Sequence, residues 1–345
     1  MITMNKASKI YVAGHNGMVG SAIVRQLKAE GFNHIVTRSS KELDLRIQAE
    51  VSGFFENEKP DYVFLAAAKV GGIMANNKFR ADFLYDNLAI QSNVISAAHE
   101  HKVKRLQFLG SSCIYPKMAP QPLKEEYLLT GPLEPTNEPY AIAKIAGIKL
   151  CDAYRDQYRD DFHSVMPTNL YGPNDNYNLK GSHVLPAFIR KFYLALLWEQ
   201  GEIDSLKKNL ASDGNAIENW EDLLNDLGIF KKGEMIKVKL WGTGTPKREF
   251  LHADDLARAC VFVMKRGMND SFVNIGVGED LAIKDLAEKV KAQVGFNGEI
   301  LWDDTKPDGT PRKLMNIDKM LSMGWKPEIS LDQGIEVVVK DYISR

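Results

Sequence analysis

The stretch Gly14-His15-Asn16-Gly17-Met18-Val19-Gly20 decides the fold of this chain of 345 residues. Its glycines have the spacing GxxGxxG, directly after the β-rich run Lys9 to Ala13 and at the start of a helical pattern from about Met18 to Glu30. Such a loop lets a pyrophosphate approach the backbone, while the helix N-terminus supplies free N–H groups and a positive dipole end. We therefore predict a dinucleotide site formed by Gly14, Asn16, Gly17, Met18, Val19 and Gly20.

Strand-like and helix-like segments alternate through the rest of the first half of the chain. The strand-like runs are 34–37, 62–67, 103–109 and 164–167, and the helix-like runs are 41–58, 79–99 and 139–158. Continuously apolar strands between helices are typical of a parallel sheet that is covered on both faces. The sequence thus predicts the α/β class, with a Rossmann doubly wound parallel sheet.

The second half is less regular and predicts a smaller, interleaved α/β substrate domain. We expect the dinucleotide-binding domain to comprise residues 1–172 plus about 250–276, and the substrate domain about 173–249 plus 277–345. Residues 195–236 are charged and helix-prone, which indicates a helical insertion in the second domain.

The composition argues against several kinds of partner and site. Lys and Arg number 44 and Asp and Glu 45, so the near-neutral charge gives no support for nucleic acid or a membrane surface as partner. The three cysteines lack paired spacing, and the histidines lack ligand spacing, so neither a disulfide framework nor a metal site is expected. No segment resembles a signal peptide or a membrane span, and a cytoplasmic location is the expectation.

The residues after the second predicted strand bear on the choice of nicotinamide cofactor. An acidic residue at the end of this strand would bind the ribose of NAD, but no acid occurs there before Glu42. Arg38, helped by Ser39, Ser40 and Lys41, could instead hold a 2′-phosphate. The sequence favours NADP, with NAD possible, and the alternative interpretation of Arg38 is a solvated loop arginine.

Tyr140 and Lys144 lie four residues apart and share one face of the predicted helix 139–158. A tyrosine with a pKa of about 10 is a poor acid–base group at neutral pH. An ammonium group beside it would stabilise the phenolate and bring its pKa toward neutrality. Because this spacing is common by chance, an exposed helix pair is the alternative interpretation.

A hydroxyl and a thiol follow the predicted strand that ends at Leu109. If the chain stays extended there, Ser111 and Cys113 point to the same side. They would then face one pocket at the carboxyl end of a parallel strand, where ligands bind in such sheets. The alternative for Cys113 is a small buried core residue.

Longer strings of sequence make the pattern specific. The chain resembles the GDP-L-fucose synthase family of extended short-chain dehydrogenases/reductases, over nearly its whole length except residues 195–236. The strings that carry this resemblance are Ala13-Gly14-His15, Ala66-Ala67-Ala68-Lys69-Val70-Gly71-Gly72-Ile73, Gly110-Ser111-Ser112-Cys113-Ile114-Tyr115-Pro116, Glu134-Pro135-Thr136-Asn137-Glu138-Pro139-Tyr140, Met166-Pro167-Thr168-Asn169-Leu170-Tyr171-Gly172-Pro173, Arg248-Glu249-Phe250-Leu251-His252 and Lys306-Pro307-Asp308-Gly309-Thr310-Pro311-Arg312-Lys313.

The resemblance implies an enzyme that epimerises GDP-4-keto-6-deoxy-D-mannose at C3 and C5 and then reduces C4 with NADPH, as a homodimer. It implies that Ser111, Tyr140 and Lys144 form the reductase triad, and that Cys113 and His183 are the base and acid of epimerisation. Ala67, Lys144 and His183 would also contact the cofactor. The GDP-sugar would be held by Trp241, Arg248, Lys306 and either Arg190 or Lys191.

Two features depart from the family pattern. The family often carries basic residues in the glycine loop and after the second strand, where this chain has Asn16 and Ser40. The insertion 195–236 is the second departure, and its expected roles are a surface elaboration, a substrate lid or an oligomer contact. Two alternative functions stay open: a C4 reductase of another GDP-4-keto sugar, such as a heptose, and a non-catalytic dinucleotide sensor.

Overall fold

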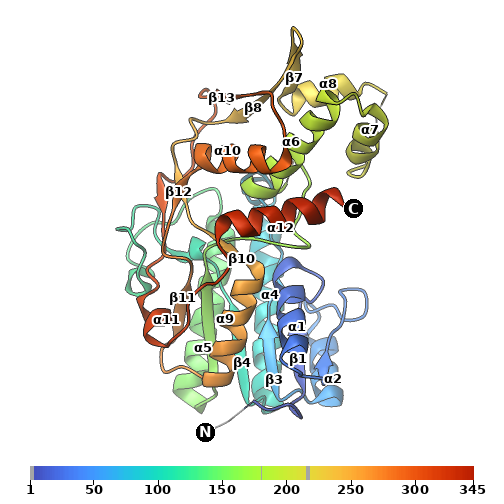
Figure 1. The fold of residues 1–345 in the computed structure, drawn as a ribbon. Helices are drawn as coiled ribbons and strands as arrows, with labels where there is room; N and C mark the ends of the chain where they lie inside the picture. The colour runs from blue at the N-terminus through green and yellow to red at the C-terminus, as the bar shows by residue number, and fades with distance from the viewer. Residues whose placement is uncertain (1–3, 180, 215–217) are drawn as a thin grey trace. The chain divides into compact units, whose positions relative to one another are not determined.

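The computed structural model describes residues 4–179, 181–214 and 218–345 (Figure 1). The chain forms two compact units. Unit 1 comprises Met1–Asn174, Glu249–Glu279 and Leu314–Ile329, and unit 2 comprises Asp175–Arg248, Asp280–Lys313 and Ser330–Arg345. The polypeptide therefore passes between the units several times, in keeping with an interleaved second domain.

Unit 1 is built on a six-stranded sheet with the strand order β11-β5-β4-β3-β1-β2, in which every pairing is parallel. Its strands are β1 (Ile10–Ala13), β2 (Ile35–Val36), β3 (Tyr62–Leu65), β4 (Arg105–Leu109), β5 (Phe162–Pro167) and β11 (Phe272–Ile275). This arrangement confirms the Rossmann-like α/β prediction.

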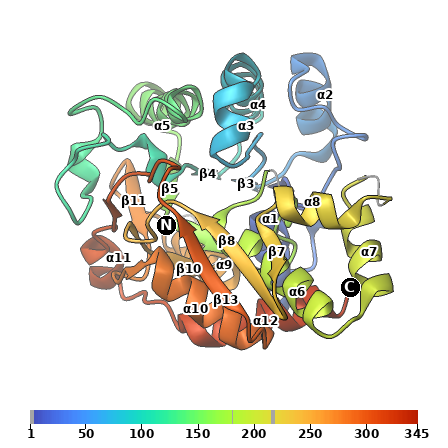
Figure 2. The ribbon, with the colours of Figure 1, turned by 90° about the horizontal axis from the view of Figure 1, so that it is seen from above.

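Helices cover both faces of this sheet. Figure 2 shows α2 (Gln48–Glu58), α4 (Arg80–Glu100) and α5 (Glu138–Tyr158) in a row over one face, with α1 (Met18–Ala29) and α9 (Ala253–Arg266) over the other. Side chains alternate along β1, so that Tyr11 joins the core under α2, α4 and α5, while Ile10 joins the core under α1 and α9. Both sides of the strand are buried, which explains its uninterrupted apolar sequence.

The shorter elements of unit 1 lie around the sheet. They are α3 (Ile73–Lys78), η1 (Ser112–Ile114), η2 (Glu125–Tyr127), β6 (Asn169–Tyr171), β10 (Phe250–His252) and α11 (Asp318–Ser322). Helix α2 begins later than the sequence predicted, because side chains before it bond to the backbone. Glu42 accepts from the Ser39 N–H at 2.7 Å, and Asp44 accepts from the Arg46 N–H at 3.0 Å.

Residues 314–329 belong to unit 1, whereas the sequence had placed them in the substrate domain. The Met315 N–H donates to the buried Glu249 carboxylate at 3.0 Å, and this carboxylate also accepts from the N–H groups of Val277 and Gly278. Leu123 donates its N–H to the Leu314 carbonyl at 2.7 Å. These bonds join segments far apart in the sequence, so no local pattern indicates them.

Unit 2 contains two small sheets and several helices. One sheet has the order β13-β8-β7 and the other β12-β9-β14. Their strands are β7 (Ile229–Lys232), β8 (Met235–Trp241), β9 (Lys247–Arg248), β12 (Leu281–Ala282), β13 (Glu299–Asp303) and β14 (Arg312–Lys313). The helices are α6 (Val184–Glu199), α7 (Ile203–Ala211), α8 (Trp220–Asp226), α10 (Ile283–Val294) and α12 (Leu331–Ile343).

The insertion 195–236 is only partly helical. It contains the end of α6, then α7 and α8, and finally β7, which pairs antiparallel with β8 at Ile229 and Val238. The insertion therefore extends a sheet of unit 2. Across the described residues, no helix combines the length and the apolarity that a membrane crossing requires.

The turn from β1 to α1 has no room for a side chain at Gly14 or at Gly20. Gly14 has a φ of +84°, and a Cβ on it would lie 2.7 Å from the backbone nitrogen of Ala67. A Cβ on Gly20, in the first turn of α1, would lie 2.1 Å from the Gly14 carbonyl oxygen. The obstacles are backbone atoms, which cannot rotate away as a flexible side chain can.

We expect the substitution Gly20→Ala to lower the free energy of unfolding by about 1–3 kcal/mol, the usual cost of overpacking. Gly53→Ala is the matched control, because Gly53 lies in α2 with no atom within 4 Å of the added Cβ. The control should raise stability by roughly 0.5–1 kcal/mol. Urea unfolding of both variants measures the difference, and equal stabilities would contradict this account of the turn.

Candidate active site

The glycine loop presents backbone N–H groups at the N-terminus of α1. Gly17 is the residue before the helix, no side chain caps the first turn, and that turn contains no acidic residue. Ala67, just beyond β3, lies against Gly14. A loop with glycines at positions 14 and 17, in front of an uncapped helix, fits a dinucleotide pyrophosphate. Asn16 is exposed at this loop, while Met18 and Val19 are half-buried.

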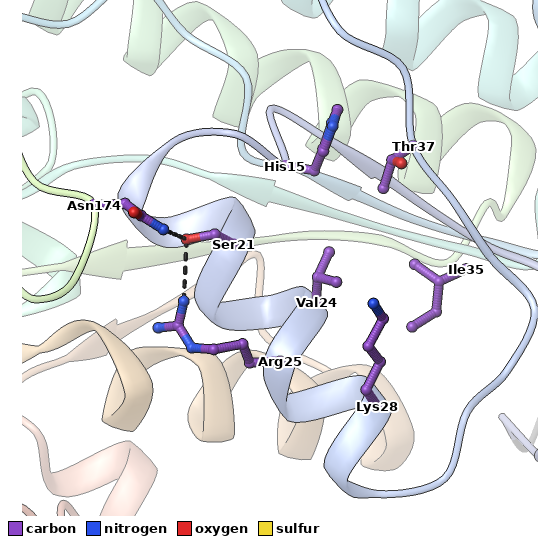
Figure 3. Close-up of a pocket in the computed structure, with 8 residues that line it drawn as sticks. All are labelled: His15, Ser21, Val24, Arg25, Lys28, Ile35, Thr37 and Asn174. Carbon is purple, nitrogen blue, oxygen red and sulfur yellow. Dashed lines mark hydrogen bonds between the residues drawn. The ribbon is translucent and has the colours of Figure 1, made fainter.

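A pocket of about 440 Å³ adjoins this loop in unit 1 (Figure 3). The residues that line it are His15, Ser21, Val24, Arg25, Lys28, Ile35, Thr37 and Asn174. The Nδ1 atom of His15 is buried without a hydrogen-bond partner among the described residues. The pocket therefore combines an unsatisfied imidazole nitrogen with Lys28 and with Arg25, whose guanidinium also pairs with Asp254, and such a set suits an anionic group.

Arg38 lies just after β2 but is not a freely solvated arginine. Its guanidinium forms a 2.5 Å ion pair with Glu58, donates to the Thr37 carbonyl at 2.8 Å and lies over the Phe54 ring. A 2′-phosphate would have to compete with Glu58 for this group. The sequence gave no sign of the pair, because the two residues are 20 positions apart.

The Tyr140 and Lys144 side chains lie together on α5. Lys144 is buried, its ammonium lies 5.7 Å from the centre of the Tyr140 ring, and it donates to the Leu109 carbonyl at 2.8 Å. This bond ties α5 to the end of β4. The Tyr140 hydroxyl makes no hydrogen bond with the described residues, so its proton is available to a ligand.

Burial opposes the expected lowering of the Tyr140 pKa. Burial raises the pKa of this hydroxyl well above its ordinary value, although part of the side chain remains accessible, and the charge of Cys113 adds to the rise. Burial also lowers the pKa of Lys144 to about 8, which weakens its ability to offset that effect. Tyr140 therefore keeps its proton at neutral pH.

The segment after β4 does not stay extended, so the prediction that Ser111 and Cys113 share one strand face is wrong. Ser112–Ile114 form the 3₁₀ turn η1, and the Ser111 hydroxyl accepts from the Cys113 N–H at 3.4 Å. The two residues are adjacent for this different reason. Cys113 is buried, and its electrostatic effect on Tyr140 places the thiol near that phenol.

His183 belongs to unit 2, where it precedes the first turn of α6. His183 is exposed in part of its surface. Desolvation by the surrounding protein disfavours the charged imidazolium and so lowers the pKa of the ring. The positive charge of Lys313 acts in the same direction. Lys313 was not singled out from the sequence, although it ends one of the strings that carry the family resemblance. It lies beside Arg248 in the pairing of β14 with β9.

The choice between Arg190 and Lys191 is resolved by their contacts. Arg190 is 2% exposed and forms a 2.6 Å ion pair with Asp213. It also donates to Tyr177, Asn209 and Ser212, so that all five of its N–H groups are used. All five donors of Arg190 are thus bonded within the protein, and its contact with the substrate stays a prediction that these bonds do not support.

Lys191 follows Arg190 on α6, so its side chain leaves the helix about 100° further round. It is half-buried and has no hydrogen bond or ion pair with any residue that the structure describes. Burial lowers its pKa to about 8. A half-buried cation without a counter-charge costs free energy that an anionic ligand would recover. Lys191 is thus the residue of this pair that suits a diphosphate.

The other predicted substrate residues gather in unit 2. Trp241 is 61% exposed at the end of β8, and the Lys306 ammonium lies 5.8 Å from the centre of its ring. The side chain of Arg248 is half-buried, and burial lowers its pKa while Asp308 opposes this effect. An exposed indole flanked by cations can stack a base and bind phosphates.

Comparison with known proteins gives a consistent result. The chain matches the NAD dependent epimerase/dehydratase family over residues 10–222 and 225–276. It is 54% identical to GDP-L-fucose synthase 1 of Arabidopsis thaliana over 339 residues, which cover 98% of this chain and 94% of the plant protein.

Two solved structures from Campylobacter jejuni are also similar. A GDP-6-OMe-4-keto-L-xylo-heptose reductase has a TM-score of 0.93 at 42% identity, with 99% of each chain covered. A GDP-mannoheptose C4 reductase with NADP bound has a TM-score of 0.86 at 42% identity, again with 99% of each chain covered. The similarity therefore extends over both units.

Proposed function

The chain belongs to the NAD dependent epimerase/dehydratase family, and within it to the GDP-L-fucose synthases, and we propose from this that it converts GDP-4-keto-6-deoxy-D-mannose to GDP-L-fucose. The enzyme epimerises C3 and C5 and reduces C4 with NADPH. The single observation that carries this proposal is the grouping of Ser111, Cys113, Tyr140 and Lys144 at the end of β4, in a chain about half identical to such enzymes.

The reduction uses Tyr140 as the proton donor. Bound NADPH supplies the hydride to C4. A tyrosine with a raised pKa is protonated when the ketone binds, as a general acid must be. Ser111 donates a second hydrogen bond to the C4 oxygen, and Lys144 holds its ammonium close enough to stabilise the phenolate that remains.

The epimerisation uses Cys113 and His183. A 4-ketone acidifies the protons at C3 and C5, so a base on one face and an acid on the other can invert each carbon. The thiol of Cys113 lies near Tyr140, which would hold the enolate oxygen between the two steps. The lowered pKa of His183 makes its imidazolium a stronger acid but leaves the ring mostly neutral at neutral pH, so His183 must take up a proton before it can return one.

The nucleotide part of the substrate is held by unit 2. Lys191, Arg248 and Lys306 supply positive charge for the diphosphate, and Trp241 supplies an exposed ring for the base. These groups also explain how a chain of formal net charge -1 binds a dianionic ligand.

A second candidate function is supported by the solved relatives. Two of them carry titles of heptose reductases at 42% identity over nearly the full chain. A C4 reductase of such a sugar would need Tyr140 and Lys144 but not proton exchange at C3 and C5. The fate of those protons therefore separates the two functions.

The proposed enzyme is a cytoplasmic homodimer. Tyr85 on α4 is 70% exposed and Ile142 on α5 is 44% exposed, on two helices that pack against each other. We propose that a second copy covers these two exposed apolar side chains.

Substituting Cys113→Ser should separate the two chemistries. A hydroxyl is far less acidic than a thiol with a pKa of about 8.5, so exchange at C3 and C5 should fall at least about 100-fold. Reduction at C4, with Tyr140 as the proton donor, should remain. NMR of GDP-4-keto-6-deoxymannose in D₂O measures exchange, and NADPH oxidation measures reduction.

The matched control is Cys260→Ser, because Cys260 lies on α9 and is buried in the core. It should lose stability but keep the exchange rate per folded molecule. Wild-type exchange in Cys113→Ser would assign Cys113 to the core and favour the reductase alone. A wild-type enzyme that reduces a heptose substrate without exchange would reject the proposed function.

Arg38→Ala should weaken NADPH more than NADH if Arg38 leaves Glu58 to bind the 2′-phosphate. A charge-assisted bond contributes about 1.5–3 kcal/mol, which corresponds to roughly 10- to 150-fold in affinity. Arg46→Ala is the control, since Arg46 is exposed and paired with Asp44. Equal losses for both cofactors would exclude Arg38, and a selective loss in Lys28→Ala would move the role to the pocket beside α1.

The affinity for the substrate should fall as the pH rises through about 8. The lowered pKa of Lys191 means that its folded-state ammonium is charged below that value and neutral above it. KM for the GDP-sugar should therefore rise above pH 8 in the wild type. Lys191→Arg should flatten this rise, because a guanidinium stays charged. A rise of the same size in both proteins would exclude Lys191.

A further inference from the structure

The guanidinium of Arg190 is bound by residues of the insertion 195–236. Three of its partners, Asn209, Ser212 and Asp213, lie at the end of α7 and in the turn that follows. The Asp213 carboxylate is only 15% exposed and supplies the counter-charge at 2.6 Å. The fourth partner is the Tyr177 carbonyl at 3.1 Å.

This cluster continues to the C-terminal helix of unit 2. The side-chain amide of Asn209 donates to the Tyr342 hydroxyl at 2.9 Å. The Tyr342 ring stacks on Tyr177 at 4.3 Å and meets Tyr193 of α6 edge-on at 5.8 Å. These contacts join helices α6, α7 and α12. We call the residues that make them the Arg190 cluster: Tyr177, Arg190, Tyr193, Asn209, Ser212, Asp213 and Tyr342.

The cluster fixes α6 against rotation about its axis. Arg190 and Lys191 are adjacent, so their side chains leave the helix about 100° apart. A rotation that moved Arg190 would move Lys191 by the same angle. His183 precedes Arg190 by seven residues, about two turns, and so lies near the same side of the helix. A buried guanidinium with all five N–H groups bonded allows little such movement.

We propose that the 209–213 turn of the insertion positions α6, and with it Lys191, for the diphosphate of the bound GDP-sugar. This inference rests on the function proposed above. The insertion then acts by holding α6 in position, and not as a lid, an oligomer contact or a surface elaboration. Arg190 and Asp213 are positioning residues, since they act on the substrate through Lys191.

The test is a comparison of GDP affinity by calorimetry, since GDP carries the diphosphate and needs no turnover. Asp213→Asn removes the counter-charge of Arg190 and should weaken GDP roughly 10-fold. NADPH affinity should stay unchanged, because the glycine loop belongs to unit 1. KM for the GDP-sugar should rise about as much as the GDP dissociation constant, with kcat within a few-fold of the wild type.

Asp332→Asn is the matched control, because Asp332 forms an exposed ion pair with Lys289 elsewhere in unit 2. It should leave GDP affinity unchanged. Tyr342→Phe removes one hydroxyl from the Arg190 cluster without changing its charge, and should weaken GDP by a smaller factor. This variant keeps the proposal testable if Asp213→Asn does not fold.

A double-mutant cycle separates positioning from a general loss of structure. In a Lys191→Ala background, Asp213→Asn should have little further effect on GDP, because the group that it positions is absent. Full additivity of the two substitutions would overturn the proposal. So would wild-type GDP affinity in folded Asp213→Asn while Lys191→Ala weakens GDP. Failure of the proposed function is recognised separately, because the wild type would then bind GDP but not convert the 4-keto-6-deoxymannose substrate.

Discussion

The approach of Gly20 to the Gly14 carbonyl is the contact on which unit 1 depends. It seats the first turn of α1 directly over the end of β1, with no side chain between them. That position brings Gly14 against Ala67 at the end of the neighbouring strand β3. Because the helix cannot move away from the sheet, its uncapped N–H groups are held in a fixed direction at the carboxyl edge. The same glycines thus allow the close packing of α1 on the sheet and leave its N–H groups open to a phosphate.

The sequence predicts those parts of the fold that local chemistry determines. The central strands were predicted because they are buried on both faces and therefore uninterrupted in their apolar character. Some predictions of local structure failed where a side chain, and not a backbone carbonyl, accepts a backbone N–H, as the Ser111 hydroxyl does from Cys113. Others failed where distant segments bond, as Glu249 does with Met315. Periodicity contains no information about either kind of contact.

The candidate site was predicted as a set of residues but not as a set of contacts. Arg190 and Lys191 are neighbours of the same charge, and the sequence alone could not say which one is buried. The rotation of α6 about its axis decides which of the two side chains is buried. Arg190 faces Asp213, its ion-pair partner, which lies more than twenty positions away in the sequence. The pKa of Tyr140 was misjudged for a similar reason, because burial and Cys113 outweigh the ammonium of Lys144. A raised pKa nevertheless suits a proton donor better than a lowered one.

The position of β11 at the edge of the sheet has a consequence for synthesis of the chain on the ribosome. Strand β5 ends at Pro167, while its partner β11 begins at Phe272, about a hundred residues later. At 5–20 residues per second, the edge of β5 stays unpaired for roughly 5 to 20 s after it emerges. An apolar strand with an open edge can pair with other nascent chains. The interleaved order of the units therefore leaves this edge unpaired during synthesis for longer than an arrangement of consecutive domains would.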